Sequence, residues 1–343
     1  MGITIKDIAK ITNCSLSTIS RVINKSGYVS EETRIKVEKA IRDYNYVPSA
    51  LAKHLTKGNN NIIGVVIPEI DNTFYSGIIK GINEYADSQG LSIILCDTGE
   101  NAGKELRLIS ELRSQRIRGL LVTSAIKNTQ NAMEISSMYD QLDMPVVLID
   151  REIPGSNFDG IFFDDERAIF DLTSLLINNT HKHIEMLAGN PDLILGQNRA
   201  RGYIKAFRSY GLEYKEEWIH YSLFTKEAGY EATMNILSRD RKDWPTALVT
   251  NNNMLTLGAL KAIFEKKLSI PQDIALVGYD QIEVLEFLKI NISLAEKDTI
   301  EMGRVAMKML CEKISDKNNA NPARRIIMMP KLMVRGSEKL IIK

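Results

Sequence analysis

The chain has 343 residues, of which 44% are hydrophobic and 25% are charged, a profile typical of a soluble protein with two or three domains. No stretch approaches the roughly 18 continuous apolar residues of a membrane-spanning helix, and Cys14, Cys96 and Cys311 are too far apart to suggest a disulfide framework or a zinc site. The amino-terminal segment lacks the apolar core of a signal peptide, so we expect a cytoplasmic protein with no membrane contact, metal or other cofactor.

Charge is distributed unevenly along the chain. The net charge is only +1, yet residues 1–60 contain ten Lys and Arg against five Asp and Glu, which leaves the remainder at −4. A basic segment on a mildly acidic body is expected when only that segment meets the phosphates of a nucleic acid.

Residues 4–24 have the pattern of two short helices separated by a tight turn. Thr4 can cap the first helix, and Asp7, three residues on, can bond the amide of the cap in return. Ser15 can cap the second helix, whose apolar face consists of Ile19, Val22 and Ile23. Two helices joined in this way form a helix-turn-helix unit, in which the second helix enters the major groove of DNA.

A third helix is expected from Ser30, because Glu31 and Glu32 place negative charge at its positive N-terminus. The apolar face that would complete a three-helix core consists of Val37, Ala40, Ile41 and Tyr44. The polar residues 57–61 that follow later are typical of a linker.

From residue 62 onward, short apolar segments alternate with amphipathic ones. The apolar segments begin at Ile62, Leu91, Gly119, Pro145, Gly160, His183, Thr246, Ile274, Ser293 and Arg324. Strands alternating with helices over about 280 residues predict doubly wound parallel sheets. One sheet of that length would be unusually large, so we expect two subdomains.

The motifs TIKDIAKITNCSLSTISRVIN, YVSEETRIKVEKAI and YNYVPSALAKHL, with the pattern of the remaining chain, resemble the LacI/GalR family of bacterial repressors over almost the whole length. The resemblance implies an all-α helix-turn-helix DNA-binding domain at 1–48, a hinge helix and linker at 49–61, and an effector-binding and dimerisation core at 62–343. The core would be α/β, of the type I periplasmic-binding-protein kind, with two doubly wound parallel-sheet subdomains: an N-subdomain at about 62–160 plus 292–323 and a C-subdomain at about 161–291 plus 324–343. The chain would cross between them near residues 161, 291 and 324, and the effector would bind in the cleft between them.

By this resemblance, side chains at the start of the second helix read the operator sequence. Leu16 and Ser17 would approach base edges, and Arg21, one turn further, can bond the O6 and N7 atoms of guanine. Short polar residues at helix starts and turns are suited to phosphate contacts that fix the register: Thr4, Ser15, Thr18, Asn24, Ser30 and Thr33. Capping alone is the alternative role for these residues.

The segment from Ser49 to Thr56 would be a hinge that becomes helical when two copies of the chain meet over the minor groove. Leu55 occupies the position of the leucine that family members insert between base pairs, and Ala52 is small enough to let the groove approach. Lys53 stands where the family usually has Arg, and lysine lacks the planar fork that makes groove contacts selective.

The resemblance also places effector-binding side chains in the cleft. Phe74 and Tyr75 open a helix after the first core strand, where rings can stack on a sugar or a purine. The carboxylates of Asp150, Asp164 and Asp280 end three apolar segments and can accept bonds from several hydroxyl groups. Further cleft positions are matched by Arg199, Phe224, Asn252 and Lys297. Core packing for the rings and helix capping for the aspartates are the alternatives.

Two departures from the family pattern bear on the effector. Asn253 stands where Asp is common, and Lys297 is a cation at a position that is often neutral. Both changes favour an anionic effector, such as a sugar acid or a sugar phosphate, over a neutral sugar.

No catalytic residues are predicted, because the nucleotide-binding, hydrolase and metalloprotease motifs are missing. His181 and His183, or the run from Asp164 to Glu166, can be interpreted as metal ligands, but satisfied imidazoles and a helix start also explain them. We therefore expect a transcriptional regulator of carbohydrate or related metabolic genes, a repressor that binds double-stranded operator DNA as a homodimer under the control of a sugar, sugar acid or sugar phosphate. The alternative is a sugar-active α/β enzyme, or a sugar-binding protein, with an accessory N-terminal module.

Overall fold

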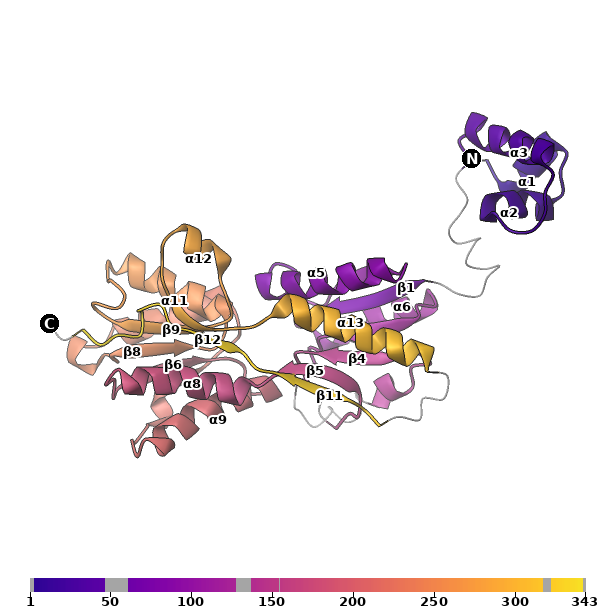
Figure 1. Ribbon diagram of the computed structural model, residues 1–343. Helices are drawn as coiled ribbons and strands as arrows, with labels where there is room; N and C mark the ends of the chain where they lie inside the picture. The colour runs from indigo at the N-terminus through magenta and orange to yellow at the C-terminus, as the bar shows by residue number, and fades with distance from the viewer. Residues whose placement is uncertain (1–2, 47–60, 128–136, 154, 317–321, 342–343) are drawn as a thin grey trace. The chain divides into compact units, whose positions relative to one another are not determined.

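The structure, a computed structural model, divides the chain into two units, Met1–Asn60 and Asn61–Lys343 (Figure 1). It describes residues 3–46, 61–127, 137–153, 155–316 and 322–341. The predicted hinge residues Ser49, Ala52, Lys53 and Leu55 lie outside these ranges, so their roles stay predictions. No helix among the described residues is long and apolar enough to cross a membrane.

Helices α1 (Ile5–Thr12), α2 (Leu16–Asn24) and α3 (Glu31–Asp43) form the described part of the first unit. Their predicted caps are confirmed. Thr4 and Asp7 form a reciprocal capping box, and the side chains of Ser15 and Ser30 accept hydrogen bonds from backbone amides at the starts of α2 and α3.

The three helices enclose a small apolar core made of Ile8, Ile19, Val22, Val37, Ala40 and Tyr46. The prediction that Tyr44 belongs to this core is wrong, because α3 ends at Asp43 and the Tyr44 side chain is 51% exposed. The chain turns through Asn45, whose φ is 46°, and brings Tyr46 back against the helices instead.

Two six-stranded sheets form the framework of the second unit. Strands of the N-subdomain are β1 (Ile62–Ile67), β2 (Ser92–Asp97), β3 (Gly119–Val122), β4 (Val146–Ile149), β5 (Asp159–Phe163) and β11 (Arg325–Met328). Strands of the C-subdomain are β6 (Ile184–Ala188), β7 (Ile219–Tyr221), β8 (Ala247–Thr250), β9 (Ala275–Tyr279), β10 (Ser293–Glu296) and β12 (Lys331–Met333). The sheet orders are β11-β5-β4-β3-β1-β2 and β12-β10-β9-β8-β6-β7. All strand pairs are parallel except β10 with β12.

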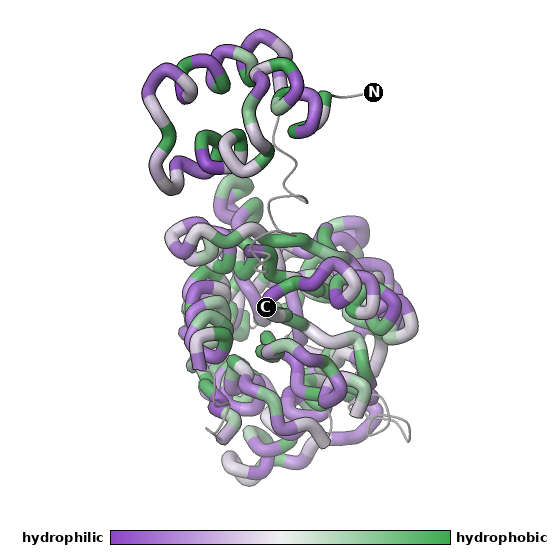
Figure 2. Tube along the Cα trace, turned by 90° about the vertical axis from the view of Figure 1, so that its right-hand side faces the viewer, coloured by the Kyte–Doolittle hydropathy of each residue, from purple (hydrophilic) through white to green (hydrophobic). Residues whose placement is uncertain are grey.

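Helices cover both faces of each sheet, as expected for a doubly wound fold. The N-subdomain contains α5 (Thr73–Ser88), α6 (Ala102–Ser114) and α13 (Thr299–Ser315), and the C-subdomain contains α8 (Asp165–Asn178), α9 (Ile194–Ser209), α10 (Lys226–Leu237), α11 (Asn253–Glu265) and α12 (Glu283–Phe287). One apolar core lies between the N-subdomain sheet and α5 with α13, and another lies on its α6 side. The C-subdomain has cores under α8 with α9 and on its α11 side. Hydrophobic and hydrophilic stretches alternate along the helical coils of the chain (Figure 2).

Helices α5 and α13 pack with their backbones in contact. A Cβ atom at Gly81 would lie 1.9 Å from the Ile300 carbonyl oxygen, and one at Gly303 would lie 2.0 Å from the Ile78 carbonyl oxygen. Glycine therefore permits the crossing on both helices. This contact fixes the first turn of α13, which follows directly after a crossing between the subdomains.

The chain crosses between the two sheets after Phe163, after Glu296 and after Met328. The crossings expected near residues 161, 291 and 324 are each a few residues too early. Residues 160–163 and 325–328 pair with each other in the N-subdomain sheet, and residues 293–295 pair with β9 in the C-subdomain sheet. The subdomain boundaries move accordingly, because a strand completes its ladder before the chain leaves the sheet.

Candidate functional site

One side of α2 is exposed and carries the predicted reading residues. Leu16 is 47% exposed, and Ser17 and Arg21 are also exposed, whereas Ile19 and Val22 are buried in the core of the three-helix unit. An exposed leucine at the start of a helix gains nothing from the protein's own core. Its position is compatible with a contact to a base edge.

The polar residues predicted to contact phosphate all form hydrogen bonds with residues close to them in the three-helix unit. Ser15 Oγ lies 2.7 Å from Ser17 Oγ and 2.8 Å from Thr18 Oγ1. Similar local bonds join Thr4 to Asp7, Asn24 to Ser20 and Ser30 to Thr33. Capping is therefore shown for Thr4, Ser15 and Ser30. Phosphate contact stays a prediction, because a hydroxyl group that caps a helix keeps further bonding capacity.

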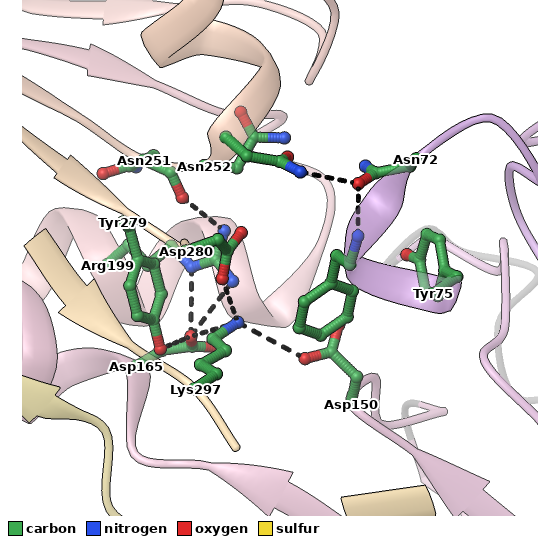
Figure 3. A network of polar contacts seen from close by, with 12 residues as sticks. Asn72, Tyr75, Asp150, Asp165, Arg199, Asn251, Asn252, Tyr279, Asp280 and Lys297 are labelled. Atoms are coloured by element: carbon green, nitrogen blue, oxygen red, sulfur yellow. Dashed lines mark hydrogen bonds and ion pairs between the residues drawn. The ribbon is translucent and has the colours of Figure 1, made fainter. Parts of the chain in front are cut away.

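The second site lies in the cleft between the two subdomains of the core (Figure 3). From the N-subdomain, Phe74 and Tyr75 enter it on the first turn of α5, and Asp150 and Arg151 enter it directly after β4. Arg151 is 6% exposed and forms a bidentate pair with Glu100, with N–O distances of 2.7 and 2.8 Å. The same guanidinium donates to the Tyr75 hydroxyl at 3.3 Å.

From the C-subdomain, a guanidinium and a carboxylate form the floor of the cleft. Arg199, on α9, pairs with Asp165 at 3.0 Å, and its ring neighbour Tyr279 donates a hydrogen bond to Asp165 at 2.7 Å. Arg199 also donates to the Asn251 carbonyl at 2.7 Å. The Phe224 ring lies 5.5 Å from Arg199 and lines the cleft together with Asn252.

The assignment of Asp164 to the effector site is wrong by one residue. The Asp164 side chain turns back to cap α8, where it accepts a hydrogen bond from the Arg167 amide at 2.9 Å, and the residue is half-exposed. Its neighbour Asp165 is 4% exposed and faces Arg199 and Lys297. A cap residue must direct its oxygen to the helix amides, so the second aspartate of the pair is free to face the cleft.

Lys297 joins the two halves of the site. Its ammonium nitrogen lies 3.6 Å from Asp150 of the N-subdomain and 3.2 Å from Asp280 of the C-subdomain, with Asp165 at 3.9 Å. A second direct link runs from the Asn253 amide to Asn72 Oδ1 at 2.8 Å.

Two of these aspartates have an uncommon backbone. Asp150 and Asp280 follow β4 and β9 with φ values of 62° and 74°, in the left-handed region that non-glycine residues rarely adopt. Burial raises the pKa of Asp280 above its ordinary value, while Lys297 and Arg199 act in the opposite direction. Such backbone strain is a common feature of binding sites, where the surrounding structure holds it in place.

The geometry of the cleft does not favour an anionic effector. The positive charge of Lys297 faces three carboxylates, and Arg151 and Arg199 each have a carboxylate partner of their own. Four further residues at this site are not predicted as effector-binding from the sequence: Asn72, Glu100, Arg151 and Asp165. Arg151 and Asp165 stand next to predicted residues, but nothing in one sequence shows which neighbour faces the cleft.

The two histidines near β6 do not form a metal site. Both ring nitrogens of His181 are bonded, to Thr246 Oγ1 and to the Glu338 carbonyl oxygen, and His183 bonds Glu185. Among the described residues there is no group of three or more side chains placed to hold a metal ion.

A helix-turn-helix unit and a two-subdomain core with a polar cleft together define a DNA-binding protein with a periplasmic-binding-protein-like core. Residues 4–49 match the family described as "Bacterial regulatory proteins, lacI family", and residues 60–334 match "Periplasmic binding proteins and sugar binding domain of LacI family". The chain belongs to the LacI family and is a DNA-binding transcriptional repressor.

Individual relatives agree with this assignment over the whole chain. The "HTH-type transcriptional repressor PurR" of Histophilus somni (strain 2336) is 33% identical over 338 residues, covering 98% of this chain and 99% of that protein. A structure of the transcriptional regulator CelR in complex with cellobiose matches with a TM-score of 0.72 and 27% identity, over 98% of this chain and 99% of that one. The lac repressor dimer bound to operator and the anti-inducer ONPF has a similar fold, with a TM-score of 0.83 at 24% identity over 99% of this chain and all of that one. These relatives are regulators of transcription, so the alternative of a sugar-active enzyme is set aside.

Proposed function

We propose that the chain represses transcription as a homodimer on double-stranded operator DNA, under the control of a small molecule that binds between its subdomains. The observation that carries this proposal is the convergence of Asp150, Asp280 and Lys297, from both sides of the cleft, on one point. Two conformations of the cleft would differ in the placement of the subdomains, and an effector that prefers one of them would bias DNA binding. A repressor of this kind acts where the chromosome lies, in the cytoplasm.

An apolar surface on the C-subdomain supports the homodimer. Helix α12 and the residue after it expose Val284, Phe287 and Leu288 by 52%, 76% and 62%. A hollow of about 780 Å³ beside them extends to α5 and the start of α13. Exposed apolar side chains grouped in this way are typical of a surface that another protein covers.

The dimer can be tested by light scattering of the full chain after size-exclusion chromatography. Phe287→Ser should shift the protein towards a monomer, and operator affinity should fall because a single DNA-binding domain contacts few phosphates. Phe264→Ser, which changes a 45% exposed ring on α11, serves as a matched control. A Phe287→Ser protein that remains a dimer would contradict the assignment of this surface.

The effector itself is proposed only as a class of ring compound rich in hydrogen-bonding groups. The relatives' name PurR suggests purines, and a similar structure holds cellobiose. Carboxylates, guanidinium groups and the rings of Phe74 and Phe224 at the cleft suit either type of ligand. The regulated genes are proposed to serve carbohydrate or related metabolism.

One pair of proteins tests the proposed function. An operator obtained by in vitro selection should bind the full chain, and a fragment 61–343, which holds four apolar cores of its own, should lose that binding. Effector binding measured by calorimetry should be equal in the two proteins. If the full chain shows no sequence preference under any effector condition, or if 61–343 still binds the operator, the proposal is wrong.

A further inference from the structure

The ammonium group of Lys297 lies in a closed cage. Besides three carboxylates, it faces the rings of Tyr279, Phe74 and Phe163, at 4.2, 4.6 and 5.0 Å from the ring centroids. Only 2% of the side chain is exposed. Carboxylates and aromatic faces are the groups that bind ammonium ions when water is excluded.

The cage would be strongly acidic without this lysine. Asp150 Oδ1 and Asp280 Oδ1 accept no hydrogen bond from any described residue, and Lys297 forms ion pairs with both carboxylates. The nearby guanidinium of Arg151 is committed to Glu100, and that of Arg199 to Asp165. Removing the ammonium group would leave buried carboxylates facing one another, which is costly.

On the side of α12, Lys297 borders the hollow of about 780 Å³ together with Phe74 and Asp280. On the side of Asp150 and Phe224, the space beside Lys297 is too small for a ligand. The cavity bounded by Asp150, Asp280 and Lys297 measures about 30 Å³, which is space for about one water molecule. It continues into a hollow of about 450 Å³ lined by Glu69, Glu100 and Phe224. A ligand that reaches the carboxylates from this side must therefore displace the lysine.

We propose that Lys297 is a built-in occupant of the effector site, and that this site selects a hydroxylated primary amine such as an amino sugar. This inference depends on one part of the proposed function, namely that the cleft is the effector site. An amine that enters the cage replaces one ammonium ion by another, and its hydroxyl groups bond the remaining carboxylate oxygens. A neutral sugar leaves the carboxylates without a counter-ion, and an anionic sugar adds repulsion. Lys297 then moves its charge towards solvent, where an ammonium group is well hydrated.

Chemical rescue tests whether the cage binds an amine, without knowledge of the effector. Lys297→Ala removes the atoms of a propylammonium ion, so 50 mM propylammonium chloride should raise the thermal midpoint of this variant by about 2–4 °C. Sodium chloride and 1-propanol at the same concentration should not. The wild type and Lys308→Ala, which removes an exposed lysine of α13, should show no such difference. Equal responses in all three proteins would overturn the proposal.

A second variant covers the case in which Lys297→Ala does not fold. Lys297→Met keeps the side chain as far as its last carbon and removes only the ammonium group, so ammonium chloride is the matching probe. The expected result is again a rise in the thermal midpoint of the variant that sodium chloride does not reproduce. Its absence in a folded Lys297→Met protein counts against the cage.

Calorimetry then tests the ligand class and the sign of the lysine's effect. Wild-type protein is titrated with D-glucosamine, D-galactosamine, D-glucose and D-glucuronate, and amines should bind tightest and glucuronate weakest. Lys297→Gln should bind the amines about tenfold tighter, because the competing group is gone. If Lys297 were an ordinary contact residue, the same variant would bind every ligand more weakly. That result, or amino sugars that bind neither protein, would overturn the assignment. Operator binding measured in parallel shows separately whether the proposed repressor function holds.

Discussion

Glu185 illustrates how much a single buried charge contributes in this protein. Its carboxylate is completely buried in β6 and accepts hydrogen bonds from His183 at 3.0 Å and from His220 and Arg239 at 2.6 Å each. Burial favours the protonated acid, but the three hydrogen bonds outweigh it and hold the pKa of Glu185 at about 2, below its ordinary value of 4.5. The ionised form therefore stabilises the fold above pH 4.5, and this contribution is lost as the pH falls from 4.5 towards 2.

Glu185→Gln should lower the free energy of unfolding at pH 7 by about 3 kcal/mol, since each pKa unit corresponds to about 1.4 kcal/mol. At pH 3 the difference from wild type should be clearly smaller. Urea unfolding at both pH values measures it, and Glu213→Gln, at an exposed position, is the control. The same loss in both variants, or a loss that does not shrink in acid, would contradict this account.

Arg21 is the only long basic side chain among the predicted reading residues of α2. Arg21→Ala should reduce the preference for the selected operator over a site with the contacted guanine replaced, by about 1–3 kcal/mol. Thr33→Ala, which removes a predicted phosphate contact on α3, should weaken binding to both sites equally. Gel-shift titrations at two salt concentrations distinguish these outcomes, and equal losses on both sites for Arg21→Ala would exclude base reading.

At the residue scale, the sequence predicts kinds of side chain better than their directions. Phe74, Asp150, Arg199, Asp280 and Lys297 were all expected in the cleft and meet there. Asp165 rather than Asp164 faces the cleft because Asp164 caps α8. Arg151 is held by Glu100, which lies 51 residues earlier in the chain. Both are tertiary facts that one sequence does not contain.

At the scale of elements, the contact between α5 and α13 is the most constrained packing described above. Gly81→Ala should destabilise the core by about 1–3 kcal/mol, because the added methyl group meets the rigid backbone of α13 rather than a movable side chain. Gly103→Ala, in α6, is the control, since its nearest neighbour is the side chain of Asn101 at 3.3 Å. Thermal unfolding of the two variants tests this, and equal midpoints would show that the crossing can relax.

All ten strands predicted from apolar segments are present, and among the described residues β7 and β12 are strands that the sequence does not predict. Both are three-residue edge strands in which Ile219 is the one buried side chain, so they lack the continuous apolar run that marks a buried strand. Crossing points were misplaced for a related reason. Periodicity shows where a strand lies, but only pairing shows which sheet it joins.

At the scale of the whole core, the described cleft is closed by the protein's own groups. Lys297, on one of the three crossings, spans Asp150 and Asp280, and Asn253 bonds Asn72 across the same gap. The fold class and the two-sheet architecture could be anticipated from alternating segments. The closure could not, because it depends on groups from distant parts of the chain meeting at a few ångströms.

The position of Lys297 also has a quantitative consequence for how the repressor would sense its surroundings. A competitor attached to the chain cannot be diluted, so its effective concentration at the site is the same in every cell and at every growth rate. The dose of effector needed for half-occupancy would then exceed the intrinsic dissociation constant by a constant factor set by the lysine's own equilibrium. Substitutions at this one position would shift the response threshold while leaving the contacts to the effector unchanged.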